Sequence, residues 1–328
     1  MRSFTSHSSH IWPGYVPPEN EELLSSWLFR MSREHKMKAF SFTSYYFKTS
    51  QIWTRDMDKY IPDEITDIII SCTPLCRNDI VRMQLNSYRD IIFEGDLSTV
   101  FTQGISNLGI YHRKRKRKGL VCCPGCLGKK EYFKKSWRLL SSLVCIECNS
   151  HLIDCCPECG EGICFHRLGM KSKSLYLEYP LYLCWNCHFD LRNSKTEVPF
   201  NSLLSDYQKF IDDTIHKGYN KHSQYSFLFF HVLFLILRKC GTSSNSWNRI
   251  RNAFVEEFNT NHPELFKRNQ FSTIDFRRQI LPMVYGLLED WPEQFIRFCK
   301  GHSLRYSDFS KEKADLPFWL YRVFKESF

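Results

Sequence analysis

The cysteines in the middle of the chain are spaced as metal ligands. The sequence has 15 cysteines in 328 residues, and eleven of them lie between Cys122 and Cys187. Four Cys-x2-Cys pairs stand in this block: Cys123/Cys126, Cys145/Cys148, Cys156/Cys159 and Cys184/Cys187. Two thiolates at this spacing can reach one metal ion, and two such pairs complete a tetrahedral shell around Zn²⁺ at about 2.3 Å. The pattern therefore predicts two zinc ions, bound by eight cysteines.

How the four pairs combine is not fixed by their spacing. Eighteen residues separate the first pair from the second, and twenty-four separate the third from the fourth. We expect sequential pairing, first with second and third with fourth, because these spacings are close to those of zinc sites built from two such pairs. A cross-brace, in which the first pair joins the third and the second joins the fourth, also fits the spacing.

Six neighbouring residues compete as ligands: Cys122, His151, Cys155, Cys164, His166 and His188. The regular spacing of the four pairs argues against them. Local sequence also favours tight turns at the pairs, since CPGC and CPEC each have a proline after the first cysteine. Gly160 follows Cys159 at a position where such a turn often needs a positive φ angle.

The predicted zinc sites are structural and not catalytic. Four thiolates close the coordination sphere, whereas a catalytic zinc keeps a position for water. The sequence contains no H-E-x-x-H, no phosphate-binding G-x-x-x-x-G-K-[ST], no G-x-G-x-x-G after a strand and no G-x-S-x-G. These observations favour a binding or adaptor protein that is not an enzyme. A zinc-dependent nucleic-acid enzyme is the alternative from another class.

A run of six positive charges precedes the first cysteine pair: Arg113, Lys114, Arg115, Lys116, Arg117 and Lys118. The whole chain has 45 Lys+Arg against 35 Asp+Glu, a formal net charge of +10, which favours a polyanionic partner. The run predicts contact with DNA or RNA phosphates, which adds salt-sensitive affinity. A charged linker is the alternative. Point charges read the phosphate backbone and not the bases, so the run predicts no sequence specificity.

Residues 1–118 read as an N-terminal helical domain that ends in the basic run. Its first helix is predicted with Asn20 as N-cap, and apolar residues recur at helical spacing from Leu23 to Met31. PDEITDIIIS and RNDIVRMQL predict two short helices joined by CTPLC. This pattern fits a helix-turn-helix whose second helix presents Arg77 and Arg82 to DNA, and ordinary packing of a three-helix core is the alternative.

Residues 119–195 read as the tandem zinc-binding module, and residues 196–328 as a C-terminal helical domain. The apolar run from Ser226 to Leu237 is shorter than the roughly 20 residues of a membrane span, so we expect a buried helix. A further helix is predicted over Trp247 to Phe258. NQFSTIDFRRQILPMVYGLL predicts a short helix pair with Arg277 and Arg278 exposed, which fits either a second helix-turn-helix or a plain helical bundle.

Together these patterns predict a mainly α fold with a central double zinc module. The amino-terminal residues MRSFTSHSSHIWPG lack the apolar core of a secretory signal, so we expect a cytoplasmic protein with no membrane partner.

Two separated motifs resemble those of the TniQ family. PPENEELLSSWLFRMSREH is similar to the opening of TniQ proteins, with these residues at matching places: Leu23, Ser26, Trp27, Leu28 and Arg30. CPGCLGKKEYFKKSWRLLSSLVCIECNSHLIDCCPECG is similar to the zinc-binding segment of the family, and RNDIVRMQLNSY resembles the stretch after its first helix-turn-helix. The resemblance covers roughly residues 17–190. The family commonly has Cys-x2-His at the second pair, and the Cys148 found here makes His151 a rival ligand.

The resemblance implies a target-selection factor of Tn7-like transposition and not a recombinase. It also implies a bacterial protein that is at the nucleoid when bound to its target. Members related to TnsD bind a chosen DNA site. Shorter members of CRISPR-associated transposons attach to a Cascade-like RNA-guided effector, often as homodimers, and help to load the AAA+ ATPase TnsC, which brings the transposase. The length of the chain and its two cysteine sets favour the CRISPR-associated type. A TnsD-like protein that reads its insertion site directly is the alternative.

Overall fold

The computed structural model describes residues 11–97, 102–108, 110–111, 114–115, 118–170, 172, 176–196, 202–241, 248–259, 273–310 and 316–328. Within these residues helices dominate, and the strands are two residues long. The mainly α fold class predicted from the sequence is therefore confirmed, with two four-cysteine clusters in its central region.

The N-terminal part consists of α1 (Leu24–Glu34), α2 (Ala39–Phe47), α3 (Asp63–Cys72) and α4 (Arg77–Met83). The apolar stripe predicted on the first helix is confirmed, since these side chains are fully buried: Leu23, Leu24, Trp27, Leu28 and Met31. The two short helices predicted downstream are α3 and α4. Their bounds leave residues 73–76 as the connecting turn.

The predicted start of α1 is wrong. The helix begins at Leu24 with Leu23 as N-cap, three residues after the N-cap expected at Asn20. Its first turn is capped by a residue far away in the sequence, because Asp58 accepts a 2.8 Å hydrogen bond from the backbone N–H of Ser25. A carboxylate that arrives from a distant segment leaves no trace in the local sequence, so a local capping rule could not find it.

The cysteine-rich part is built from very short elements. An antiparallel pair joins β1 (Ile110–Tyr111) to β2 (Lys114–Arg115), α5 spans Pro124–Lys129, and a second antiparallel pair joins β3 (Val144–Cys145) to β4 (Ser150–His151). Single turns of 3-10 helix occur here and in the N-terminal part: Gln51–Thr54, Leu85–Tyr88, Lys135–Arg138, Phe165–Arg167 and Leu191–Asn193.

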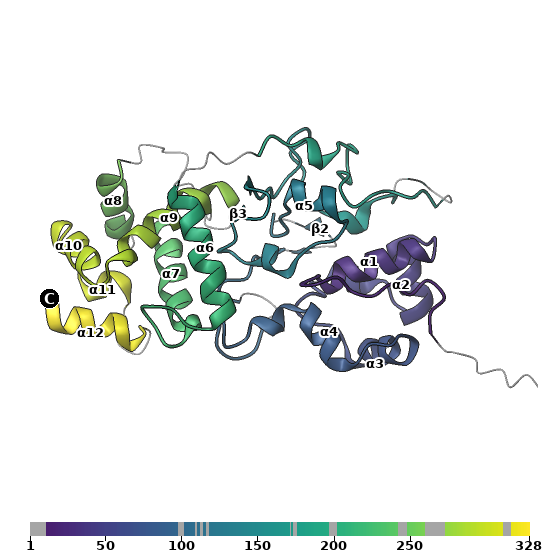
Figure 1. Ribbon diagram of the computed structural model, residues 1–328, viewed down its shortest axis with the longest axis horizontal. Coiled ribbons are helices and arrows are strands. Elements are labelled where there is room, and N and C mark those ends of the chain that lie inside the picture. The colour runs from purple at the N-terminus through teal and green to yellow at the C-terminus, as the bar shows by residue number, and fades with distance from the viewer. Residues whose placement is uncertain are drawn as a thin grey trace, which may run out of the picture.

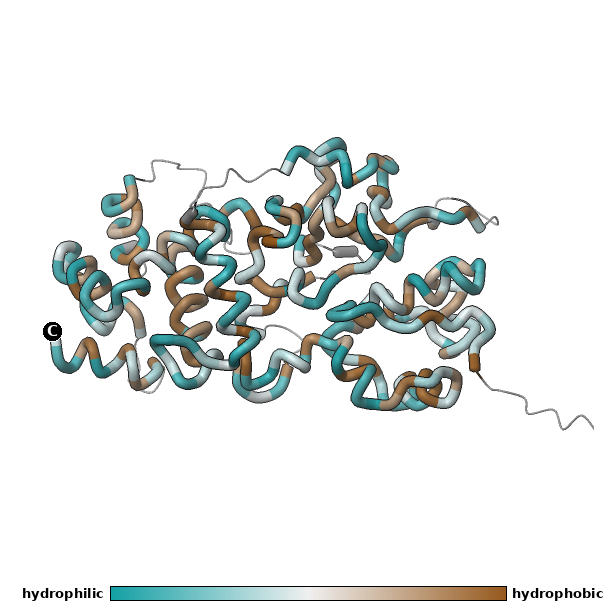
Figure 2. The backbone as a smooth tube through the Cα atoms, viewed as in Figure 1, coloured by the Kyte–Doolittle hydropathy of each residue, from teal (hydrophilic) through white to brown (hydrophobic). Residues whose placement is uncertain are grey.

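The C-terminal part is helical: α6 (Ser202–Lys217), α7 (Ser226–Gly241), α8 (Asn248–Glu257), α9 (Ile274–Glu289), α10 (Glu293–Gly301), α11 (Tyr306–Phe309) and α12 (Phe318–Ser327). The buried helix predicted from Ser226 is confirmed as α7, an apolar helix in the middle of this group (Figure 2). The helix predicted over 247–258 is α8; Trp247 lies outside the described residues.

The helix pair predicted after residue 269 is a single helix in the described residues. From Ile274 to Glu289, α9 is continuous despite Pro282. The expected exposure of Arg277 is also wrong: its side chain is fully buried, and its guanidinium donates a 2.7 Å hydrogen bond to the carbonyl of Leu140. Arg278 is mostly buried too. A buried arginine cannot read DNA, so the second helix-turn-helix lacks the contact residues that suggested it.

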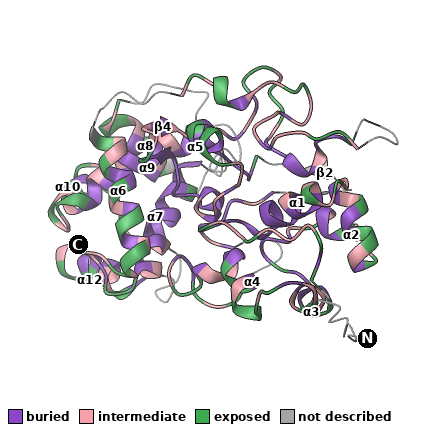
Figure 3. Cartoon of the chain, turned by 45° about the vertical axis from the view of Figure 1, so that its right-hand side comes forward, coloured by how far each residue is buried: buried purple, intermediate pink, exposed green. Residues whose placement is uncertain are grey.

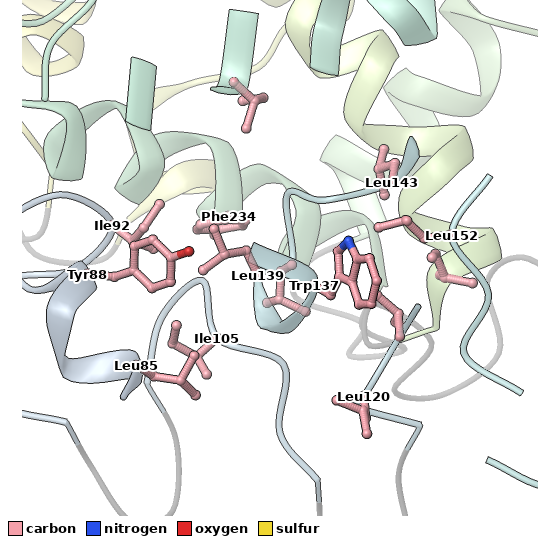
Figure 4. Close-up of a cluster of buried hydrophobic side chains, with 14 of the residues drawn as sticks. Leu85, Tyr88, Ile92, Ile105, Leu120, Trp137, Leu139, Leu143, Leu152 and Phe234 are labelled. Atoms are coloured by element: carbon pink, nitrogen blue, oxygen red, sulfur yellow. The ribbon is translucent and has the colours of Figure 1, made fainter. Parts of the chain in front are cut away.

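The three parts share one interior. Figure 1 shows α1–α4 at one end of the molecule and α6–α12 at the other, with the cysteine-rich segments joining them. Apolar side chains from all three form a continuous cluster, in which Leu85, Trp137 and Phe234 lie near one another (Figure 4). Buried residues accordingly run from α1 through the cysteine-rich segments into α7 and α9 (Figure 3). The boundaries predicted at residues 118 and 195 stay predictions.

Across the described ranges, every helix is too short or too polar to cross a membrane.

Candidate metal centres

Eight cysteines gather in two groups of four. Cluster 1 consists of Cys123, Cys126, Cys145 and Cys148, and cluster 2 consists of Cys156, Cys159, Cys184 and Cys187. Within each cluster the four Sγ atoms all lie within 4.8 Å of one another. The first pair meets the second and the third meets the fourth, so the grouping is the sequential one and not the cross-brace.

The spacing of the sulfurs in cluster 1 fits a metal ion. The Sγ atom of Cys126 lies 3.5 Å from that of Cys145 and 3.6 Å from that of Cys148. Four sulfurs placed about 2.3 Å from a tetrahedral Zn²⁺ are about 3.8 Å apart. The sulfurs of a disulfide are about 2.05 Å apart. The cluster therefore has the dimensions of a tetrahedral thiolate shell.

Cluster 2 has the same dimensions but is closer to solvent. Its Sγ atoms lie 3.7 Å apart between Cys156 and Cys187, and 3.6 Å apart between Cys159 and Cys184. Cys187 is exposed and Cys159 is half-buried, whereas three of the four cysteines of cluster 1 are fully buried. The donor set is identical in the two clusters, so any difference in metal retention comes from the surroundings.

Cluster 1 begins at the start of a short helix. Cys123 is the N-cap of α5, and its sulfur accepts a 3.4 Å hydrogen bond from the backbone N–H of Cys126. Pro124 occupies the first helical position, where its missing N–H is not needed. At Gly125 a Cβ would lie 2.9 Å from the Sγ atom of Cys148, so only glycine lets the two pairs approach this closely.

Three of the four pairs end in a left-handed backbone turn. The residue after the second cysteine has a positive φ angle at Asn149 (48°), Gly160 (72°) and His188 (60°). The positive φ predicted for Gly160 is confirmed. Asn149 and His188 were detectable as well, because asparagine and histidine are both enriched in this conformation.

In each cluster the electrostatics favour ionisation of one sulfur over its neighbours. The pKa values of Cys123 and Cys159 are lowered, whereas these are raised: Cys126, Cys145, Cys156 and Cys184. Hydrogen bonds from the thiols of Cys126 and Cys145 lower the pKa of Cys123 to about 2. Burial opposes ionisation of Cys159, but the backbone N–H of Glu161 and neighbouring side chains bring its pKa down to about 7. A divalent cation would allow the remaining thiols to ionise as well, because metal binding and deprotonation of cysteine are coupled.

The rival ligands lie outside both clusters. His151 is displaced from cluster 1 although it follows Cys148 closely, and burial followed by the charge of Arg278 lowers its pKa to about 4. His166 stacks on Trp53 with ring centroids 5.2 Å apart. Among the described residues, the remaining rival ligands also belong to neither cluster: Cys122, Cys155, Cys164 and His188.

The two arginines predicted on the recognition helix differ in availability. Arg77 is held by Asp63 at 2.7 Å and by Asp67 at 2.5 Å, both on the preceding helix α3. Arg82 is 80% exposed, and its guanidinium is 4.0 Å from the carboxylate of Asp79. The side chain of Arg82 is therefore accessible to a ligand, whereas Arg77 links α4 to α3 through its ion pairs.

The basic run is only partly described. Lys114 and Arg115 form strand β2, so this part of the run is a hairpin strand and not an extended linker. Lys118 is exposed. Arg113, Lys116 and Arg117 lie outside the described residues.

Sequence reasoning missed a buried ion network that joins the helices to the cysteine-rich part. Arg138 is fully buried and donates hydrogen bonds of 2.6 Å to Asp56, 3.0 Å to Asp58 and 2.9 Å to the carbonyl of Ser106. Asp58 is the carboxylate that caps α1 through Ser25. These residues are far apart in the sequence, and nothing in their local patterns indicated a network.

The chain is a mainly helical protein with two tetracysteine clusters in its central region. Residues 13–152 match the model of the TniQ family, so the chain contains a TniQ domain. The matched segment includes all of cluster 1 and ends before cluster 2. TniQ proteins are transposition regulators and generally non-catalytic, and the domain implies a role in target selection of Tn7-like transposition. No curated protein matches the chain.

Proposed function

We propose that the chain is a non-catalytic target-selection adaptor of Tn7-like transposition. It links a Cascade-like RNA-guided effector to the AAA+ ATPase TnsC, and so to the transposase, on DNA in the bacterial cytoplasm. The observation that carries the proposal is the TniQ domain over residues 13–152. The effector branch of the proposal rests on the presence of both cysteine clusters, which favours the CRISPR-associated type over the TnsD-like one.

Each cluster binds one structural Zn²⁺ in this proposal. Four thiolates at tetrahedral spacing support it, since they leave no coordination position for a substrate or a water. The metal supplies cross-linking of the chain. The cysteines hold segments with very little regular secondary structure, and the adjoining helices pack on the result.

The proposed mechanism is recruitment by proximity. Helices α1–α4 and α6–α12 lie at opposite ends of the molecule and offer separate surfaces to separate partners (Figure 1). Holding an effector and an ATPase on one adaptor converts the second binding event into an intramolecular one, which raises its effective concentration. The exposed Arg82 and Lys118, with the basic run 113–118, add contact with DNA or RNA phosphates.

Reconstitution with purified partners tests the adaptor. We expect the chain to increase retention of TnsC on effector-bound target DNA by roughly 100-fold, and to have little effect when the effector is left out. Retention can be measured by fluorescence of labelled TnsC on immobilised DNA. Equal retention with and without the effector would show that the adaptor proposal is wrong.

Footprinting of the chain alone distinguishes the adaptor from the TnsD-like alternative. The exposed Arg82 on α4 is the observation that favours this alternative. A direct reader would protect one defined DNA site at physiological salt, and single base substitutions would each cost about 1–3 kcal/mol of binding. The adaptor is expected to bind DNA weakly and without a defined site. Arg82→Ala should then reduce binding to all sequences alike.

A further inference from the structure

The segment that leads into cluster 1 is held from the C-terminal side of the molecule. The phenol of Tyr207 on α6 donates a 3.0 Å hydrogen bond to the carbonyl of Ser141. The next residue, Gln208, accepts two hydrogen bonds with one side-chain oxygen, from the backbone N–H of Leu143 at 2.8 Å and from that of Val144 at 3.3 Å. Helix α6 thus binds the backbone immediately before Cys145.

These contacts are inaccessible to water. Tyr207 is fully buried and Gln208 is 1% exposed. The side-chain amide of Gln208 is itself oriented, because its nitrogen donates a 2.9 Å hydrogen bond to Asp212 one turn along the helix. A buried N–H that loses its acceptor has no water to replace it, so the orientation of Gln208 determines the path of residues 143 and 144.

We propose that Gln208 is a positioning residue for the metal centre of cluster 1, and that metal binding there is coupled to docking of α6. The inference rests on the metal-binding part of the proposed function. Val144 and Cys145 form β3, which packs against α6, so the residue that Gln208 fixes adjoins a ligand (Figure 1). Coupling of this kind is reciprocal: metal bound at cluster 1 must stabilise the docked α6 as much as docked α6 stabilises the metal.

Cluster 2 provides an internal control because the segment between its two pairs is supported from the other end of the molecule. From the C-terminal part, the backbone N–H of Ile274 in α9 donates a 3.4 Å hydrogen bond to Asp154, just before the first pair. Phe165, between its two pairs, packs against Phe29 of α1 with ring centroids 5.6 Å apart. The backbone N–H of Leu181 donates a 3.0 Å hydrogen bond to Glu131, which pairs with Arg33 of α1 at 2.7 Å. A change at Gln208 should therefore leave cluster 2 nearly unaffected.

Hydrogen exchange during chelator titration of the zinc-loaded full-length protein measures the two clusters separately. Peptides covering residues 143–153 report cluster 1, and peptides covering residues 181–191 report cluster 2. In the unaltered protein we expect α6 and residues 143–153 to lose protection at the same chelator concentration. Gln208→Leu should lower that concentration about 10-fold, the scale of effect seen for residues that orient metal ligands, and shift residues 181–191 less than twofold.

A paired substitution separates positioning from general damage to the fold. Gln208→Glu combined with Asp212→Asn exchanges donor and acceptor within the pair and keeps an oxygen facing the two backbone N–H groups, so it should restore most of the loss. Lys209→Ala, an exposed neighbour on the same helix, should change nothing.

Three outcomes would overturn the inference: equal shifts at both clusters in Gln208→Leu, no rescue by the paired substitution, or loss of α6 protection at a different chelator concentration from residues 143–153. The last comparison uses the unaltered protein and so holds even if Gln208→Leu does not fold. Elemental analysis distinguishes failure of the coupling inference from failure of the metal-binding proposal. Zinc present in both clusters without coupling refutes only the inference, whereas zinc absent from both refutes the metal-binding proposal with it.

Discussion

Clusters 1 and 2 each consist of four cysteines, but different parts of the molecule pack against them. Cluster 1 lies within the TniQ domain, and α6 holds the strand that carries Cys145. Cluster 2 lies beyond the matched residues, packs toward α1 and exposes Cys187. Ligand spacing therefore determines that two centres form, whereas burial and backbone support determine how firmly each is held. We expect cluster 2 to release its metal first.

The largest expected effect on stability comes from single substitutions that each remove one cysteine ligand, one variant for each cluster. Structural zinc contributes on the order of 10 kcal/mol to folding in small domains, about as much as the whole stability of a typical protein. Cys145→Ser should therefore abolish cooperative unfolding, because the buried centre and the docking of α6 are lost together. Cys187→Ser should lower Tm and still leave a cooperative transition, since Cys187 is exposed.

Circular dichroism melts together with zinc content per chain measure this difference. Cys155→Ser is the matched control, because Cys155 lies in the same block and belongs to neither cluster. Indistinguishable melts for the Cys145 and Cys187 variants would mean that the two clusters fold as one unit.

The second largest effect is expected from Arg138, which joins the cysteine-rich part to the N-terminal helices through Asp56 and Asp58. Arg138→Met leaves Asp58 buried without its cation, and breaking such a pair costs about 3–5 kcal/mol. Burial raises the pKa of Asp58 and Arg138 opposes that rise, so the pKa of Asp58 is higher still in the variant. A carboxyl with a raised pKa in the folded state is penalised as pH rises, so the stability deficit should shrink from pH 7.5 to pH 5.5.

Urea denaturation at the two pH values tests this prediction. The control is Arg322→Met, which removes an exposed pair with Glu326 and should cost under about 0.5 kcal/mol. A deficit that stays constant with pH would show that the buried charge of Asp58 is not its cause.

The metal clusters were predictable from the sequence because each ligand pair is local. Two residues between cysteines fix their mutual reach. The sequential grouping was only the favoured alternative, because a cross-brace fits the same spacing, and the positions of the sulfurs in the structure decide between the two. The apolar stripe of α1 and the buried helix α7 were predictable for the same reason, since helical periodicity is local. The N-cap of α1 was not, because Asp58 reaches Ser25 from a separate segment.

Arginines were the least predictable residues. Arg77, Arg82, Arg138 and Arg277 are equally cationic in the sequence, yet the structure ties the first to α3, exposes the second and buries the last two. Which of these happens depends on carboxylates and carbonyls supplied by remote segments. Charge alone therefore overestimates the surface available for nucleic acid. Arg77 is 50% exposed but is engaged by two carboxylates, and Arg82 is 80% exposed.

The smallest expected effects come from two glycines, one in each cluster. Gly125→Ala would place a Cβ 2.9 Å from the sulfur of Cys148, and overpacking of this kind costs about 1–3 kcal/mol. Gly160→Ala has open space around the new Cβ, so its cost is the left-handed backbone at φ 72°, about 1 kcal/mol. The first change should weaken zinc binding at cluster 1 and the second at cluster 2.

Gly160→Asn separates the two causes, because asparagine tolerates the left-handed conformation and should restore most of the loss at cluster 2. No equivalent rescue exists at Gly125, where every side chain meets the same sulfur. Chelator titration followed by hydrogen exchange at residues 143–153 and 181–191 resolves the two centres. If Gly125→Ala weakened both clusters equally, the metal ions would be coupled to each other more strongly than to their own supports, and the contrast between α6 and α1 would lose its physical basis.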